Sequence, residues 1–197
     1  MKASLIKLPI FATLMAMLIS LAPAADEAAP PVKQPDEATM KVVQAAQELH
    51  KEKKYQESEA LLTKAIADGN DHITVKMALA VSYAYQKEFK KASELYGKAW
   101  AETKDVGMLE SYSVALLQQK DIEGLKKITE DLVTHFDKMK EGRLAVIMVA
   151  TAEGDQSLFN RAIAKIPTEE ITKDKQLAMI LAKAAKKIAE DSLKEKK

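Results

Sequence analysis

Apolar residues recur every three or four positions from Glu37 almost to the end of the chain. This spacing places them on one side of successive helices and predicts an all-α fold. The β-branched run at 146–149 follows the same spacing, and no Gly or Pro bounds it closely enough for a strand. The pattern divides into four helix pairs and a final helix, at 37–52 with 55–67, 73–87 with 89–103, 107–119 with 122–136, 142–153 with 155–165, and 173–195.

The predicted helices are separated by residues that favour turns. Such residues occur at Gly69-Asn70-Asp71, at Lys120-Asp121 and at Gly154-Asp155. Pro167-Thr168 interrupts the helical pattern before the final helix. The punctuation therefore agrees with the division into hairpins.

A set of positions in the second helix of each pair returns after 34 residues. Tyr55, Ser58, Leu62 and Ala65 are followed by Phe89, Ala92, Tyr96 and Ala99. The next two sets keep apolar character more than identity: Ile122, Leu125, Thr129 and Leu132, then Gln156, Phe159, Ile163 and Ile166. A repeat of this length indicates stacked helical hairpins, each too small to bury its apolar face alone.

The second repeat resembles the tetratricopeptide-repeat family. The segment 79–83 (LAVSY) is similar to the first-helix signature of that family, with Ala80 in place of its common Gly, and Phe89, Ala92, Tyr96 and Ala99 match its second-helix signature. The usual Trp of the first helix is replaced by Lys76, and the closing Pro by Lys104. The resemblance covers 37–166 and is strongest over 55–100.

The resemblance implies a right-handed superhelical solenoid of three to four helical hairpins. First helices of the repeats are expected to line its concave groove. The segment 167–197 is expected to form a C-terminal capping helix over the last hairpin, with Leu177, Leu181 and Ile188 on its apolar face.

The first 24 residues have the composition of a secretory signal peptide. Lys2 and Lys7 precede a mostly apolar run at 8–21, and Ala22-Pro23-Ala24 supplies the small residues that signal peptidase requires. We expect cleavage after Ala24 and export, most simply to a bacterial periplasm. Secretion, or anchoring by an uncleaved signal, is the alternative. Residues 25–36 hold three prolines without apolar periodicity and are expected to form a disordered linker.

Composition narrows the classes of partner. The chain has no cysteine, which excludes disulfides and a lipid-anchored lipoprotein. Without Lys2 and Lys7, 28 of the 30 basic residues remain against 29 acidic ones, so nothing favours nucleic acid or an anionic membrane. No membrane span is expected once the signal is removed.

A spare apolar stripe marks a candidate partner-binding groove. Met77, Val81 and Tyr85 share one face of the helix 73–87, nearly opposite the face that packs within the repeat. The same offsets in the other first helices select Val43, Gln47, Val114, Gln118, Leu144 and Met148. This chemistry favours a protein or peptide helix laid into the groove.

Two other interpretations of the stripe stay open. The nine side chains could instead contact neighbouring hairpins or the C-terminal helix and be buried. The apolar stripes could also be buried between subunits of a self-associating envelope component, that is, a homo-oligomer. A clamp for acidic C-terminal peptides is not expected, because the matching positions hold no cation: Val43, Gln47, Ala78, Gly107 and Ser111.

No pattern predicts catalysis, a cofactor or a metal. His50, His72 and His135 have no ligand spacing relative to one another, and we expect each at the surface. The six glycines form no phosphate loop, there is no GxSxG elbow, and a thiol nucleophile is impossible. The sequence therefore predicts a non-enzymatic interaction protein without cofactors.

Overall fold

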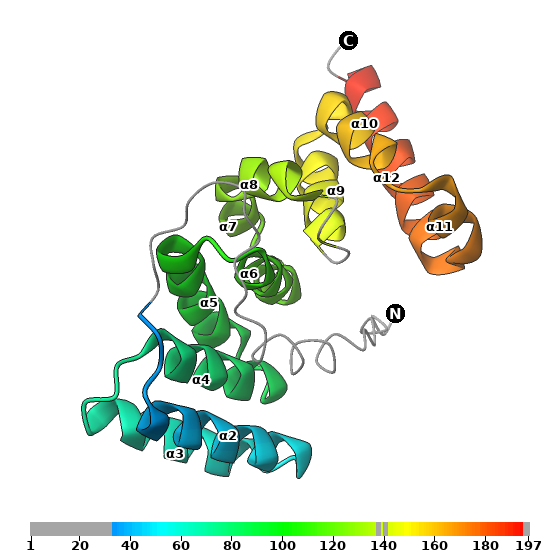
Figure 1. The fold of residues 1–197 in the computed structure, drawn as a ribbon. Helices are drawn as coiled ribbons and strands as arrows, with labels where there is room; N and C mark the ends of the chain where they lie inside the picture. Colours follow the sequence, from blue (N-terminus) through cyan, green and yellow to red (C-terminus); the bar gives the residue numbers. More distant parts are fainter. Residues whose placement is uncertain (1–32, 137–138, 140–141, 195–197) are drawn as a thin grey trace. The chain divides into compact units, whose positions relative to one another are not determined.

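The computed structural model describes residues 33–136, 139 and 142–194. The predicted signal peptide and most of the predicted linker lie outside these residues, while 33–36 precede the first described helix without helical structure. Eleven helices and no strand occur in the described part (Figure 1). The all-α prediction is confirmed.

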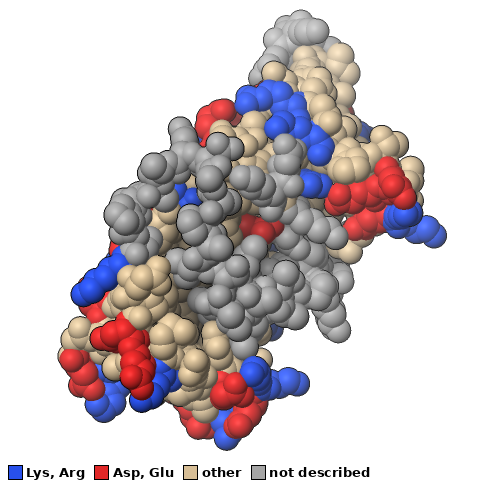
Figure 2. Space-filling view, in the orientation of Figure 1, with Lys and Arg blue, Asp and Glu red and all other residues tan. Residues whose placement is uncertain are grey.

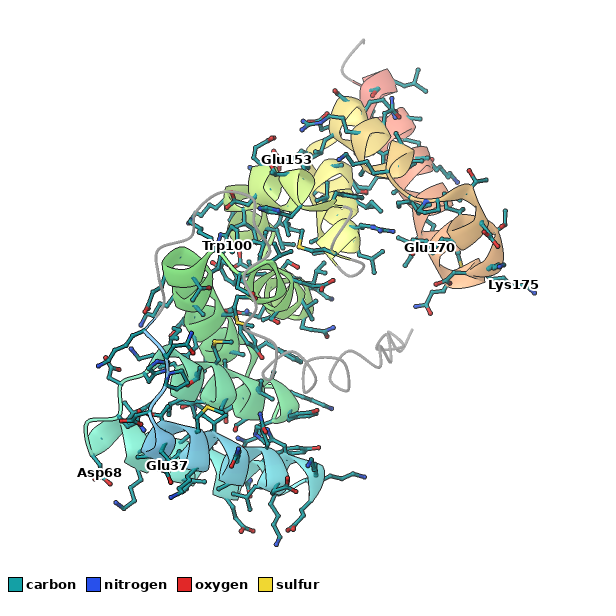
Figure 3. All side chains as sticks on the ribbon, in the orientation of Figure 1. Glu37, Asp68, Trp100, Glu153, Glu170 and Lys175 are labelled. Atoms are coloured by element: carbon teal, nitrogen blue, oxygen red, sulfur yellow. The ribbon has the colours of Figure 1, made fainter. Side chains whose placement is uncertain are left out.

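The chain forms two compact units, residues 1–107 and residues 108–197. The described helices of unit 1 are α2 (Glu37–Lys51), α3 (Tyr55–Ala67), α4 (Ile73–Tyr85) and α5 (Phe89–Thr103). Each packs against the next, and α2 also packs against α4. In Figure 3, Glu37 and Asp68 lie at the same end of the first hairpin, because α3 runs back along α2.

Unit 1 is centred on α4. Ten of its 13 residues are buried, because it contacts α2, α3 and α5. One core cluster joins the first three helices: Val43, Ala46, Leu62, Ala65, Val75, Ala78 and Leu79. Small residues such as Ala46 and Ala78 leave room for the helices to approach.

Unit 2 begins within α6 (Val106–Gln119) and continues through six more helices. These are α7 (Ile122–Lys127), α8 (Thr129–Thr134), α9 (Gly142–Glu153), α10 (Gln156–Ala164), α11 (Thr168–Lys173) and α12 (Lys175–Lys194). The central helix is α9, which packs against α7, α8, α10 and α12. As expected, the final helix covers the last hairpin: α12 contacts both α9 and α10.

The helix predicted at 122–136 is divided at Ile128. The Ile128 N–H bonds to the Leu125 carbonyl, three residues back, and Ile128 has φ −111° and ψ 7°. The Thr129 hydroxyl donates to the Leu125 carbonyl at 2.9 Å, a back-bond that bends helices. The β-branched pair thus tightens the chain into a short turn between α7 and α8.

The helix predicted at 173–195 is also preceded by a helix that the sequence pattern missed. Pro167 ends the previous pattern as predicted, but its carbonyl accepts from Glu170 and opens α11 at once. A proline just before a helix is compatible with its first turn, because it lacks only an N–H that would be unpaired there. Asp174 separates α11 from α12, and its carboxylate accepts from Gln176 and Leu177 at 2.9 and 3.0 Å.

The same turn closes the first helix of all four predicted hairpins. Its left-handed residue is Lys53, Lys87, Lys120 and Gly154 in turn, with φ between 58° and 68°. The next N–H bonds five residues back in every case, from Lys54 to Leu49, Glu88 to Tyr83, Asp121 to Leu116, and Asp155 to Ala150, at 2.8–3.0 Å. This is the Schellman arrangement. The repeat therefore extends through the local structure of both units, including the hairpins in which sequence identity is low.

Candidate functional site

The nine predicted groove residues fall into two groups. Val43, Met77, Val81 and Val114 are buried, with exposed fractions of 2–6%. Gln47, Tyr85, Gln118, Leu144 and Met148 are half-buried. The four buried side chains do not present the open surface that was expected of them.

Packing explains the burial of Val43 most clearly. It belongs to the core cluster with Leu62 of α3 and Leu79 of α4. The contact of α2 with α4 covers this face of the first helix. The alternative in which stripe residues contact neighbouring helices therefore holds for Val43.

A buried polar cluster lies beside the half-buried part of this stripe. His50, at the end of α2, is only 4% exposed, so the prediction that it lies at the surface is wrong. Its Nε2 is 2.8 Å from Ser82 Oγ of α4 and 2.9 Å from Ser58 Oγ of α3. The two serine oxygens are 3.0 Å apart, and both serines are fully buried. We call His50, Ser58 and Ser82 the polar cluster.

Two tyrosines pack against the histidine ring. Tyr55 and Tyr85 are stacked, with ring centroids 4.5 Å apart and an interplanar angle of 6°. Their centroids lie 6.2 and 5.6 Å from that of His50. Both tyrosines are half-buried, so the pair separates the polar cluster from solvent while keeping part of its own surface exposed. With Gln47, one turn before His50 on α2, these rings form a surface that we call the aromatic edge.

Burial sets the electrostatics of the polar cluster. It lowers the pKa of His50 to about 4, because the charged imidazolium loses its hydration. Burial also raises the pKa of Tyr96, and burial followed by the nearby Tyr55 raises that of Tyr85. His50 is thus neutral at neutral pH, and its ring nitrogens serve as one donor and one acceptor.

The polar cluster lacks the arrangement of a hydrolytic triad. His50 Nδ1 has no hydrogen-bond partner among the described residues, so no carboxylate orients the ring. Ser58 and Ser82 are 0% exposed, which leaves no path for a substrate to either hydroxyl. Three mutually bonded polar groups from three helices instead fix how α2, α3 and α4 pack.

The repeat itself carried a signal for the polar cluster. Thirty-four residues after His50 and Ser58 stand Ala84 and Ala92, both buried. A histidine and a serine at positions that are buried in the next repeat indicate a paired interior site. Spacing between histidines, the test used for metal ligands, could not detect this.

The other two histidines differ from His50. His72 is half-buried and caps α4: its Nδ1 accepts from the Thr74 N–H at 3.2 Å, and its Nε2 donates to the Lys33 carbonyl at 2.7 Å. His135 is half-buried in unit 2. Within the described ranges no three His, Asp or Glu side chains are placed to hold a metal ion.

A cavity of about 640 Å³ lies beside the His72 cap. Its polar lining includes Asp36, Asn70 and Asp71. Asp36 accepts from the Thr39 N–H, and the Thr39 hydroxyl donates to Asn70, so the cavity wall is the start of α2 joined to the α3–α4 turn. Its polar groups are occupied in fastening the N-terminal end of the first hairpin.

Charge is distributed evenly over unit 1. Figure 2 shows acidic and basic side chains interspersed over its described helices, and its ion pairs are mostly between neighbouring turns, as in Glu37–Lys41 and Lys64–Asp68. Exposed pairs of this kind contribute little to stability. No helix in the described part of the chain is long and apolar enough to cross a membrane.

Comparison with known protein families, with curated proteins and with solved structures finds no match for this chain.

Proposed function

We propose that the protein is an exported, non-enzymatic scaffold that binds a protein or peptide segment. The observation that carries the proposal is the aromatic edge of unit 1. Stacked Tyr55 and Tyr85 are rigid, half-exposed and held against a buried cluster. Tyrosines with an apolar body and a polar tip are enriched in protein interfaces.

The proposed surface is narrower than the groove predicted from the sequence. It keeps Gln47 and Tyr85 and omits the buried Met77 and Val81. Gln47 adds an amide beside the rings, which suits an extended or helical segment that offers both apolar groups and hydrogen bonds. For so small a surface we expect a dissociation constant on the order of micromolar.

The proposal of a non-enzymatic role rests on the polar cluster. It is the one histidine–hydroxyl arrangement that the described residues bring together at hydrogen-bond distance within the core, and it is closed to substrate. The tetratricopeptide-like pattern of the second repeat supports the same class of function.

Site-specific photocrosslinking in the intact producing cell tests the proposed surface. A photoreactive residue at Gln47 is expected to form a discrete adduct, whereas the same residue at the exposed Lys41 of α2 should form none. Tyr85→Ala should weaken the Gln47 adduct without changing the helical circular-dichroism signal. Identical adducts at both positions, or none at Gln47, would contradict the proposal.

Export is tested separately, by mass spectrometry of the protein purified from the envelope fraction. The proposal expects an N-terminus at Ala25, following cleavage after Ala24. A chain that retains its first 24 residues would favour the anchored alternative.

A further inference from the structure

The outer face of α12 carries apolar side chains where a capping helix normally has polar ones. Met179 is 52% exposed and Leu193 is 65% exposed, two of the three large hydrophobic residues that are exposed in the described part. Between them, at alternating spacings of three and four, lie exposed residues. We call the five residues the outer seam: Met179, Ala182, Lys186, Ala189 and Leu193.

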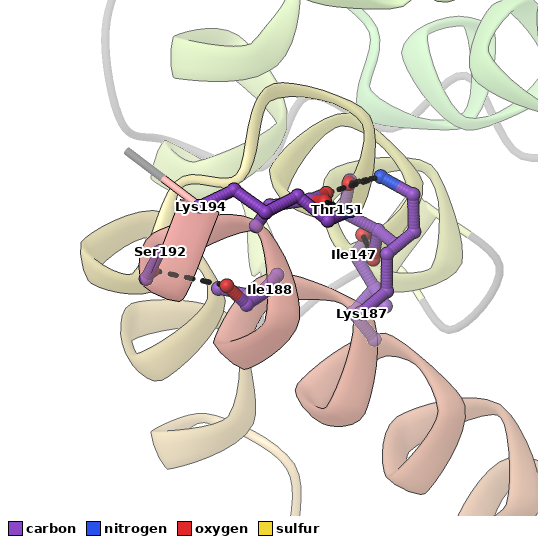
Figure 4. Close-up of polar contacts among 7 residues, drawn as sticks. Ile147, Thr151, Lys187, Ile188, Ser192 and Lys194 are labelled. Atoms are coloured by element: carbon purple, nitrogen blue, oxygen red, sulfur yellow. Dashed lines mark hydrogen bonds and ion pairs between the residues drawn. The ribbon is translucent and has the colours of Figure 1, made fainter. Parts of the chain in front are cut away.

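The opposite face fixes the orientation of α12 in unit 2. Leu177, Leu181, Ala184 and Ile188 are buried, where α12 packs against α9 and α10. Figure 4 shows Lys187 reaching α9, where its Nζ donates to the Thr151 carbonyl at 2.9 Å. At 100° per residue, the outer seam lies on nearly the opposite side of the helix and is therefore turned away from the core of its own unit.

We propose that the outer seam binds the outer seam of a second copy of this chain, with the two α12 helices antiparallel. Spacings of three and four are those of a coiled-coil seam. Antiparallel pairing places Leu193 of one copy between Met179 and Ala182 of the other, and Lys186 against the small Ala189. Each large apolar side chain then meets an apolar neighbour.

Charge on the two flanks of the seam decides the orientation. One flank holds the exposed Lys183 and Glu190, and the other holds Ala178, Ala185 and Ser192, which carry no charge. In an antiparallel pair like flanks face each other, so Lys183 of each copy meets Glu190 of the other, twice by symmetry. In a parallel pair each charged flank would face an uncharged one.

The seam is short, and the association is correspondingly weak. From Met179 to Leu193 the helix rises about 21 Å, well below the extent of a standard stable interface. Lys186 adds a charge at the centre, although its Nζ lies 3.8 Å from Glu190 of its own helix. We expect a dissociation constant on the order of tens to hundreds of micromolar. This inference does not depend on the aromatic edge, which belongs to unit 1.

Sedimentation velocity of the purified protein, from about 10 µM to about 1 mM, tests the pairing. Lys183→Glu and Glu190→Lys should each weaken self-association about tenfold, because each creates two like-charge contacts. The double substitution should restore it. Lys127→Glu, an equal charge change at an exposed position of α7, is the control and should have no effect.

The outer seam itself is tested by Met179→Ser combined with Leu193→Ser. This variant should abolish association while circular dichroism stays unchanged, because both side chains are exposed. A wild-type monomer at every concentration would overturn the proposal. So would a double charge swap that associates as weakly as its single parents.

The orientation can be measured directly because the chain has no cysteine. On mild oxidation, Lys186→Cys chains mixed with Ala189→Cys chains should form mixed disulfide dimers. Ala182→Cys chains alone should form few, since the two copies of this position are far apart in an antiparallel pair. Efficient Ala182→Cys homodimers would indicate parallel pairing and contradict the proposed arrangement.

Discussion

The two units solve the same packing problem with different precision. In unit 1 the central helix α4 is buried at ten of 13 positions and is joined to its neighbours by the polar cluster. In unit 2 the central helix α9 is buried at six of 12 positions, and the helix before it is divided at Ile128. The turn after each first helix is nevertheless the same.

This comparison separates two kinds of repeat information. The Schellman turn depends on backbone hydrogen bonds and tolerates Lys or Gly at its left-handed residue. The core depends on the volumes of side chains that contact one another, and these change together. Sequence identity decays where packing has diverged, while the turn geometry persists.

Core truncation should give the largest effect and show whether the units are stabilised separately. Leu62→Ala in unit 1 and Leu132→Ala in unit 2 each remove a fully buried side chain and should each cost about 2–5 kcal/mol. Trp100, the sole tryptophan, reports on unit 1 alone. In urea, its fluorescence midpoint should fall for Leu62→Ala and stay nearly constant for Leu132→Ala, whose loss should be detected by circular dichroism. Equal shifts of the Trp100 midpoint would show a single cooperative unit.

Acid should destabilise unit 1 through His50. Its pKa is about 4 in the folded state against an ordinary value of 6.5, so the unfolded chain binds the proton first as the pH falls. The contribution of the neutral histidine is complete above about pH 6.5 and is lost as the pH falls toward 4, about 3 kcal/mol in all. Urea midpoints from Trp100 fluorescence at pH 7.5, 5.5 and 4.5 measure this loss.

His50→Leu is the matched variant for the acid effect. It should be less stable at pH 7.5, because Ser58 and Ser82 lose their shared partner, but flatter between pH 7.5 and 4.5. Unit 2 has no fully buried histidine in its described part, since His135 is half-buried. A pH slope that is unchanged in His50→Leu would assign the effect to other groups.

The smallest effects should come from the shared turn. Lys53→Gly and Lys87→Gly should each stabilise unit 1 by about 0.5–1 kcal/mol, because glycine has no Cβ to strain the left-handed conformation. Gly154→Ala should destabilise unit 2 by about 1 kcal/mol. An added Cβ there meets only Asp191 at 3.9 Å, so the cost comes from the backbone. Thermal unfolding measures all three, and a destabilised Lys53→Gly would show that the lysine side chain has a role of its own.

Periodicity alone predicted the all-α fold and the positions of most helices, because helical spacing of apolar residues is a local property. It could not predict the division at Ile128 or the short α11, which depend on single hydrogen bonds at Leu125 and Pro167. The groove was predicted from helical faces, and these do not reveal which face a third helix covers. Val43 is buried because α4 lies against α2, a contact between residues far apart in the sequence.

The central claim is that one hairpin geometry occurs four times across a chain whose repeat has diverged. The one-bond Cα–Hα coupling measured by nuclear magnetic resonance depends on the sign of φ and tests this claim residue by residue. The account predicts positive φ at Lys53, Lys87, Lys120 and Gly154 alike. Negative φ at Lys120 and Gly154, with positive φ kept at Lys53 and Lys87, would confine the repeat to unit 1 and contradict the account.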